Sequence, residues 1–222
     1  MTIFSSKVVN RMIYARLAVY LIGSLIFSLG ISITINMQHL GIHPWDVLNV
    51  GLFDKFGLSI GTWNIIVGAV LITMSLILDR TYVKVGTVLN AVLVGMFVDL
   101  YLWLGFLPTA TNTWTDALVL VVGIVVMGIG GGTYNAAGIG SGPRDGFMLS
   151  ISDKTGVSIG KVRIIIESIV LVIGLLIGGP VFIFTFIFTF IQSPIFQFVY
   201  LKIVNYLKRF EKRVNEQKSR AI

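Results

Sequence analysis

A 33-residue stretch of this chain occurs twice, and the second copy follows the first by 99 residues without a gap. Residues 34–66 align with residues 133–165, and thirteen of the 33 aligned positions are identical. The identities include prolines, glycines and aspartates, which set turns and helix ends rather than only filling apolar space. An internal repeat of this kind indicates a fold made of two similar halves.

Long apolar segments place both halves in a membrane. Hydrophobic residues make up 55% of the chain and charged residues 12%, a balance that few soluble domains have. About 20 apolar residues cross a bilayer core. Six segments have this character: Leu17–Ile35, Ile60–Leu78, Val85–Phe106, Ala117–Tyr134, Val157–Ile177 and Val181–Leu201. We therefore expect an all-α polytopic membrane protein with six transmembrane helices in a single integral membrane domain, residues 1–222. Its repeats cover about residues 17–106 and 116–205, and a basic tail covers 206–222.

The repeat and the charges together predict that the two halves are inverted. Each repeat contains three spans, and an odd number reverses the second copy, so a pseudo-two-fold axis should lie in the membrane plane. With six spans, sixteen of the 17 lysines and arginines fall on the side of the two termini, and Lys55 alone falls on the other. The positive-inside rule then places both termini in the cytoplasm. Because topology explains the net charge of +7, no nucleic-acid partner is expected.

Each half also contains a short segment that is too polar to span, residues 43–56 and 142–155. Both begin with Pro-x-Asp, at residues 44–46 and 143–145. Proline suits the first turn of a helix, and an acid there meets the positive end of the helix dipole. We expect two short helices, either lying at the interface or dipping into the membrane as re-entrant segments. A glycine should end each one and a serine should cap the span that follows: Gly57, Gly156, Ser59 and Ser158.

Paired motifs in the two halves resemble a known family. The second half reads Gly-x-Gly-Pro-Arg-Asp-Gly at 140–146 and Gly-Val-Ser-Ile-Gly at 156–160, followed by Arg163 and by Gly-Gly-Pro at 178–180. The corresponding motifs of the first half are His-Pro-Trp-Asp at 43–46, Gly-Leu-Ser-Ile-Gly at 57–61 and Asn64. These motifs are similar to those of the YczE/YyaS/YitT family of bacterial integral membrane proteins, in particular its YczE branch. The resemblance implies a multi-pass protein of the bacterial plasma membrane and supplies no catalytic residues.

Arg144 is the most suggestive candidate for ligand binding. It follows a glycine-rich turn at the expected start of a helix, where backbone N–H groups and a guanidinium can bind an anion together. The alternative is an interfacial arginine paired with Asp145 or with a lipid phosphate. Further polar residues in or beside the spans complete a hypothetical substrate site, although hydrogen bonding between helices explains such asparagines equally well. The full set is Arg144, Asp145, Asp46, Asn36, Asn135, Asn64 and Arg163.

Two acids within the expected spans are candidates for proton coupling. Glu167 lies in the first half of the fifth span, and an acid in a membrane helix faces the protein interior as a rule. It is either a proton carrier or a structural partner of Arg163, one helical turn away. Asp99 lies near the outer end of the third span, where it can also reach the interface.

Other chemistries find no support. The chain has no cysteine, and His39, His43 and Asp46 alone are too few for a convincing metal site, so neither a metal nor another cofactor is expected. The two Gly-x-Ser-x-Gly matches precede spanning helices instead of following a strand, so an enzyme is not expected. Glycines cluster between Gly128 and Gly142, which indicates either close helix packing or an unwound stretch of the fourth span.

Two functions remain open. The first is a transporter for a small polar or anionic metabolite, since inverted repeats are typical of transporters. The second is a non-transporting accessory or scaffold protein that binds a cytoplasmic enzyme complex or lipid. A cavity lined by polar groups from both repeats would favour the first, and a dry core the second. The basic tail, with apolar residues at helical spacing, is expected to lie on anionic lipids of the inner leaflet.

Overall fold

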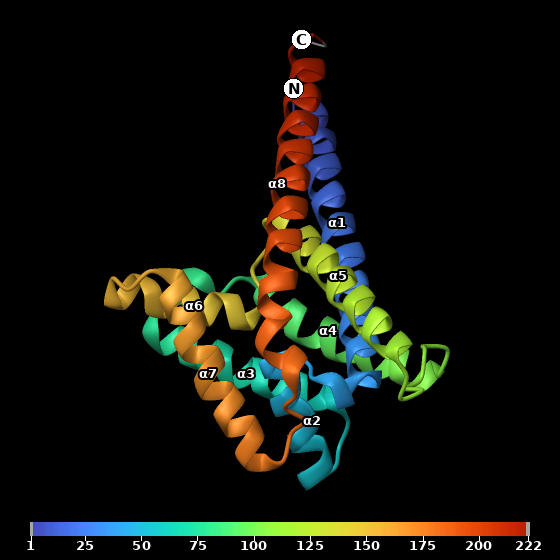
Figure 1. Cartoon of the computed structure of the whole chain (residues 1–222). Coiled ribbons are helices and arrows are strands. Elements are labelled where there is room, and N and C mark those ends of the chain that lie inside the picture. The colour runs from blue at the N-terminus through green and yellow to red at the C-terminus, as the bar shows by residue number, and fades with distance from the viewer. Residues whose placement is uncertain (1, 221–222) are drawn as a thin grey trace.

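The chain folds into eight α-helices and two short 3-10 helices, without a strand in the part that is described. The computed structural model describes the backbone of residues 2–220 and the side chains of residues 12–214 and 216. The order is α1 Thr2–Asn36, η1 Gln38–Leu40, α2 Pro44–Phe56, α3 Ile60–Leu78, η2 Arg80–Tyr82, α4 Val85–Leu104, α5 Trp114–Ala136, α6 Pro143–Thr155, α7 Ile159–Ile177 and α8 Ile183–Arg220 (Figure 1). The all-α prediction is confirmed.

Five helices are long and apolar enough to cross a membrane. They are the segments Met12–Asn36, Ile60–Leu78, Val85–Leu104, Trp114–Ala136 and Ile183–Val214. The remaining expected span corresponds to α7, which has 19 residues but carries Lys161, Arg163 and Glu167. Length and composition thus establish a polytopic membrane protein.

The two short helices begin and end where the sequence predicts. Proline is the first residue of both α2 and α6. Gly57 and Gly156 follow their last turns with φ angles of 73° and 70°, a conformation in which glycine avoids the clash of a side chain. Ser59 caps α3 by accepting a hydrogen bond from the Thr62 N–H at 3.1 Å. The matching prediction for Ser158 is wrong, because its side chain makes no capping bond.

Helices α1 and α5 pack together at backbone contact distance. A Cβ added at Gly23 would lie 2.4 Å from the Tyr134 nitrogen, and one at Gly130 would lie 2.2 Å from the Phe27 nitrogen. Residues later in α1 contact residues earlier in α5, so the two helices run antiparallel. Helix α5 is continuous through its glycines, so they serve packing, and the alternative of an unwound stretch is wrong.

The short helices pack on spans of the opposite half. Helix α2 contacts α7, where Gly174 and Gly179 approach the α2 backbone around Val47. Helix α6 in turn contacts α3. The Pro-x-Asp helix of each half therefore packs against the other half. The starts of α2 and α6 lie next to each other, where Arg144 contacts Trp45 and Asp46.

The basic tail continues α8 as one helix instead of forming a separate element. Helix α8 passes through Pro194 and runs beside α1 at the end of the molecule that holds both termini (Figure 1). Arg16 of α1 pairs with Glu211 at 3.5 Å. Leu207 and Val214 belong to the apolar residues of the tail that were expected to face lipid, and both are buried within the protein. They are covered because α1 lies along this part of α8 (Figure 1).

Candidate functional site

A cavity of about 310 Å³ lies where the starts of α2 and α6 meet. Residues of all eight α-helices or their caps line it, so both halves of the repeat contribute. Its lining is strongly polar for the interior of a membrane protein. The polar residues include Asn64, Asn90, Arg144, Asp145, Arg163, Glu167, Thr189, Gln192 and Gln197.

Arg144 joins the two halves at this cavity. Its Nη2 donates to Asn64 Oδ1 at 2.9 Å and to Asp46 Oδ1 at 3.3 Å, and both partners belong to the first half. The guanidinium also lies 5.4 Å from the centre of the Trp45 ring, a cation–π distance. Arg144 therefore has partners within the protein, and the predicted alternative of a pair with Asp145 is wrong, because the guanidinium pairs with Asp46.

Two polar atoms beside Arg144 are buried without a hydrogen-bond partner. They are Trp45 Nε1 and the second carboxylate oxygen of Asp46, Oδ2. The exposed fraction of these residues is only 2% and 1%. An unpaired buried polar atom costs roughly 1–3 kcal/mol. Within the described residues, the region around Arg144 thus retains hydrogen-bonding capacity that the protein itself does not use.

The second arginine of the cavity pairs within its own half. Arg163 Nη2 donates to Asp145 Oδ1 at 3.2 Å. The prediction that Arg163 braces Glu167 is therefore wrong, because the guanidinium turns to α6 instead of to the next turn of α7. Glu167 does face the protein interior, as expected of an acid in an apolar helix. Its Oε2 accepts a hydrogen bond from Thr189 at 3.2 Å.

His43 lies between the start of α2 and Glu167. Its Nδ1 accepts from the Trp45 N–H at 3.4 Å, and its Nε2 lies 3.8 Å from Glu167 Oε1. Burial holds the pKa of His43 well below its ordinary value, and the guanidiniums of Arg144 and Arg163 add to this. The Nε2 atom of the ring is the one that faces Glu167. No lysine or arginine of the described residues lies within ion-pair distance of Glu167.

The N-terminus of α6 is open toward the cavity. No side chain caps it, whereas His43 caps the equivalent position of α2. Gly142, Pro143 and Arg144 line the cavity at this point. The free N–H groups of the first turn carry a partial positive charge that favours an anionic group.

Three sequence-predicted residues lie away from the cavity. Asn36 donates to the Pro108 carbonyl at 3.0 Å, and Asn135 donates to the Gly131 carbonyl of its own helix at 3.0 Å. Asp99 accepts hydrogen bonds from the Gly61 N–H at 2.8 Å and from the Ser59 hydroxyl, so it binds the N-terminus of α3. The structure brings together the other candidates, namely Asp46, Asn64, Arg144, Asp145, Arg163 and Glu167.

Sequence reasoning missed several cavity residues, although the repeat held a usable signal. Trp45 aligns with Arg144, and Asn90 aligns with Thr189, at the same 99-residue spacing. Asn90 was already a candidate as a polar residue within a span, and extending the alignment beyond residue 66 would have added its mate Thr189. Nothing in the sequence singled out Gln192 and Gln197, which lie on α8 among apolar residues.

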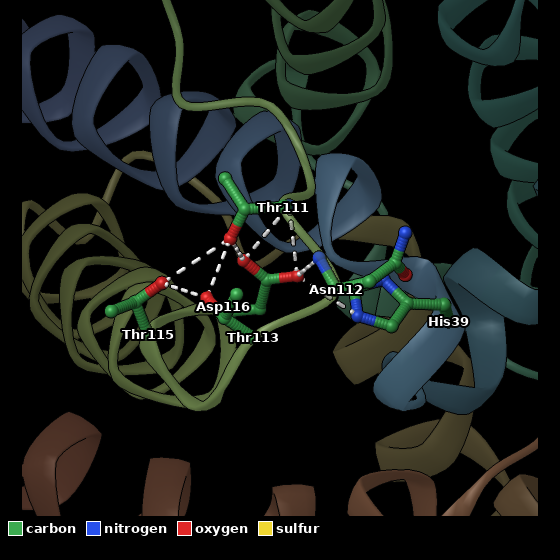
Figure 2. A network of polar contacts seen from close by, with 6 residues as sticks. All are labelled: His39, Thr111, Asn112, Thr113, Thr115 and Asp116. Carbon is green, nitrogen blue, oxygen red and sulfur yellow. Dashed lines mark hydrogen bonds and ion pairs between the residues drawn. The ribbon is translucent and has the colours of Figure 1, made fainter.

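A second polar cluster lies at the start of α5, and none of its residues lines the cavity (Figure 2). Asp116 is 2% exposed and accepts hydrogen bonds from the Thr111 N–H, the Thr111 hydroxyl and the Asn112 N–H, at 2.7–3.1 Å. His39 Nε2 lies 3.1 Å from its Oδ2. The cluster ties the loop before α5 to η1 and serves the fold. An aspartate in the first turn after a threonine-rich loop was its only sequence signal.

Taken together, the apolar helices and the cavity with its polar side chains define an α-helical integral membrane protein with a polar site between its helices. The chain matches the model of a family described as "Family of unknown function (DUF6198)" over residues 14–201, and it belongs to that family. The resemblance to the YczE/YyaS family is thereby confirmed.

Two relatives come from Bacillus subtilis (strain 168). The chain is 35% identical over 195 residues to "Uncharacterized membrane protein YczE". The aligned region is 86% of this chain and 89% of that protein. It is 32% identical over 163 residues to "Uncharacterized protein YyaS", which covers 73% of this chain and 81% of that protein. No solved structure matches the chain significantly.

Proposed function

We propose that the protein is a transporter for a small polar or anionic metabolite in the bacterial plasma membrane, and not an enzyme. The observation that carries this proposal is the cavity with polar side chains, which is lined from both halves and includes Arg144, the partner of Asp46 at 3.3 Å. Substrate sites of inverted-repeat transporters lie at the interface of the repeats, beside helix N-termini. The starts of α2 and α6 have this position here.

The proposal includes two inverted repeats, and the contacts of α1 with α5 support it. These helices are repeat mates, yet they pack antiparallel. The contact of Gly23 with Tyr134 has a counterpart near Gly123 and Thr34, as a two-fold axis between the helices requires. The exchange of α2 and α6 between the halves has the same symmetry.

We include α7 as the sixth span. Its bounds lie 99 residues after those of α3, from Ile60–Leu78 to Ile159–Ile177. Two of its three charged side chains, Arg163 and Glu167, line the cavity and so are shielded from lipid. Only Lys161, two residues from the helix start, is exposed, and a lysine there can extend to the membrane surface. With six spans, the distribution of lysine and arginine favours cytoplasmic termini.

The alternative is a scaffold that works through its cytoplasmic faces. The long basic end of α8 is the observation in its favour, since it offers a charged surface to lipids or to a protein partner. A scaffold, however, requires no polar interior. Unpaired polar atoms in the core, such as Trp45 Nε1, favour a protein that accepts a polar ligand.

Metabolite profiling tests the proposal. Cells that overproduce the wild-type protein should differ from vector cells in the internal or external level of at least one small polar metabolite. Cells with Arg144→Gln at equal membrane abundance should match the vector cells. Lys208→Gln is the matched control, because Lys208 is an exposed basic residue of α8 outside the cavity. Equal profiles for wild type and Arg144→Gln would contradict transport through this cavity.

A further inference from the structure

The charges that line the cavity leave one carboxylate without a cationic partner. Arg144 pairs with Asp46, and Arg163 pairs with Asp145. Glu167 accepts a hydrogen bond from the Thr189 hydroxyl and faces the His43 ring, without a lysine or arginine at ion-pair distance in the described residues. With Asp46, Asp145 and Glu167, the site holds three carboxylates against two guanidiniums.

An electropositive region lies in the same cavity. It consists of the uncapped N-terminus of α6 and the guanidinium edges of Arg144 and Arg163 that Asp46 and Asp145 do not occupy. Trp45 adds an indole N–H that is 98% buried and has no acceptor. These groups are all donors, so they suit the oxygen atoms of a carboxylate.

The two poles are close enough for one small ligand. Arg163 and Glu167 are four residues apart on α7, which places them on one helix face with Cβ atoms roughly 5–6 Å apart. Arg163 forms its ion pair with Asp145 and not with Glu167, and both Arg163 and Glu167 line the cavity. A volume of about 310 Å³ accommodates a small metabolite. Aromatic rings supply the rest of the wall, from Phe27, Trp45, Tyr134, Phe196 and Tyr200.

A simple anion fits this arrangement poorly. It would enter a site with more carboxylates than guanidiniums, and it would leave Glu167 without a cationic partner. A simple cation would satisfy Glu167 but would leave the α6 N-terminus and Trp45 Nε1 without acceptors. A ligand with both charges satisfies both ends.

We infer that the cavity binds a small zwitterion of the α-amino-acid type with an apolar or aromatic side chain. Its carboxylate lies at the start of α6 between Arg144 and Trp45, its ammonium group faces Glu167, and its side chain contacts the aromatic wall. The inference rests on the proposed function, in that the cavity is the substrate site.

Thermal stability of the purified protein tests the ligand class. The twenty standard L-amino acids serve as probes, each at millimolar concentration, because a ligand that binds the folded state raises the apparent Tm. We expect the neutral amino acids with apolar or aromatic side chains to stabilise the protein. The best of them is then compared with its analogue lacking the amino group and its analogue lacking the carboxylate, and neither should stabilise it. Equal stabilisation by the carboxylic acid analogue, or no stabilisation by any amino acid, would overturn the inference.

Variants locate the ammonium group. Glu167→Gln should weaken the binding of the best amino acid by about tenfold or more, since it replaces a charge-assisted hydrogen bond with a neutral one. Asp54→Asn removes an exposed carboxylate at the far end of α2 and should leave binding unchanged. Unchanged binding by Glu167→Gln would overturn the assigned orientation.

A failed inference and a failed transport function give different results. If overproducing cells change the level of a metabolite that is not a zwitterion, transport stands and the ligand class is wrong. If an amino acid binds with the expected dependence on Glu167 but reconstituted vesicles take none up, the site stands and transport is wrong.

Discussion

Arg144 shows how much depends on one position at which the two copies differ. Its repeat mate is Trp45, and the cation–π contact places these mates against each other at 5.4 Å. Its ion-pair partner Asp46 is 1% exposed, so this buried carboxylate depends on the guanidinium for its charge partner. The pair therefore couples binding chemistry to the stability of the fold.

Removal of this guanidinium should destabilise the protein more than removal of the whole pair. Arg144→Gln leaves a buried carboxylate unpaired, which costs about 3–5 kcal/mol. Adding Asp46→Asn should recover part of the loss, because it removes the unpaired charge. Apparent Tm values of the wild type, both single variants and the double variant give the coupling. If the two single losses simply add, the ion pair makes no net contribution.

At Asp116 the structure predicts a loss of stability without a loss of binding. Asp116→Asn replaces one acceptor oxygen with a donor and removes the charge that faces His39, so at least one of the bonds from Thr111 and Asn112 must break (Figure 2). Hydrogen bonds to a charged group contribute about 1.5–3 kcal/mol each. We expect a lower apparent Tm and an unchanged metabolite profile in overproducing cells. A changed profile at equal abundance would show that this cluster takes part in transport.

The candidate residues could be found from the sequence to the extent that the repeat marked them. Asp46, Asn64 and Arg163 stood out because their repeat mates are also polar, and Arg144 because it replaces Trp45 at the start of a helix. The structure brings these residues to one place. The partners could not be found in this way. Whether Arg163 turns to Glu167 or to Asp145 depends on the packing of α6 against α7, which no local pattern encodes.

Among the elements, the glycine-mediated contact of α1 with α5 determines how closely the two halves approach. Packing of small residues takes the place of the hydrophobic effect between helices in lipid. Glycines of both helices contribute, for example Gly30 against Met127 and Gly130 against Phe27. A side chain at either position would force the helices apart.

A matched pair of glycine variants tests this contact. Gly130→Ala places a Cβ 2.2 Å from the Phe27 backbone nitrogen, which must shift, whereas Gly160→Ala in α7 meets nothing within 4 Å. Overpacking of this kind costs about 1–3 kcal/mol. Gly130→Ala should therefore lower the apparent Tm, while Gly160→Ala should leave it unchanged or raise it slightly. Equal Tm values for the two variants would contradict the close approach.

Element ends were predictable where a residue imposes them and not elsewhere. Proline at the start and glycine at the end gave the bounds of α2 and α6. The apolar runs gave the core of α1 and α8 but not their polar extensions to Thr2 and Arg220, because hydrophobicity ends at the membrane surface while a helix does not. The extensions depend on a neighbouring helix, as the Arg16–Glu211 pair indicates.

On the scale of the whole molecule, the two halves are similar in path and different in chemistry. Helices α2 and α6 have equal lengths and mated bounds, yet only α2 has a side-chain cap at its start and only α6 carries an arginine there. A symmetric site would hold two identical charges facing each other. The divergence of the copies instead produces one cavity with distinct positive and negative ends, which a directional, asymmetric ligand can recognise.

The proposed inversion of the two halves makes a prediction about membrane sides. Phe56 and Thr155 are the last residues of α2 and α6, they are repeat mates, and both are exposed. Inversion should place them on opposite sides of the membrane, with Phe56 outside. Because the chain has no cysteine, Phe56→Cys and Thr155→Cys each introduce a single reactive thiol. In intact cells without an outer membrane, an impermeant maleimide should label Phe56→Cys at once and Thr155→Cys only after permeabilisation. Labelling of both thiols from the same side would require parallel repeats, and the antiparallel contact of α1 with α5 would then have to arise without a two-fold axis in the membrane plane.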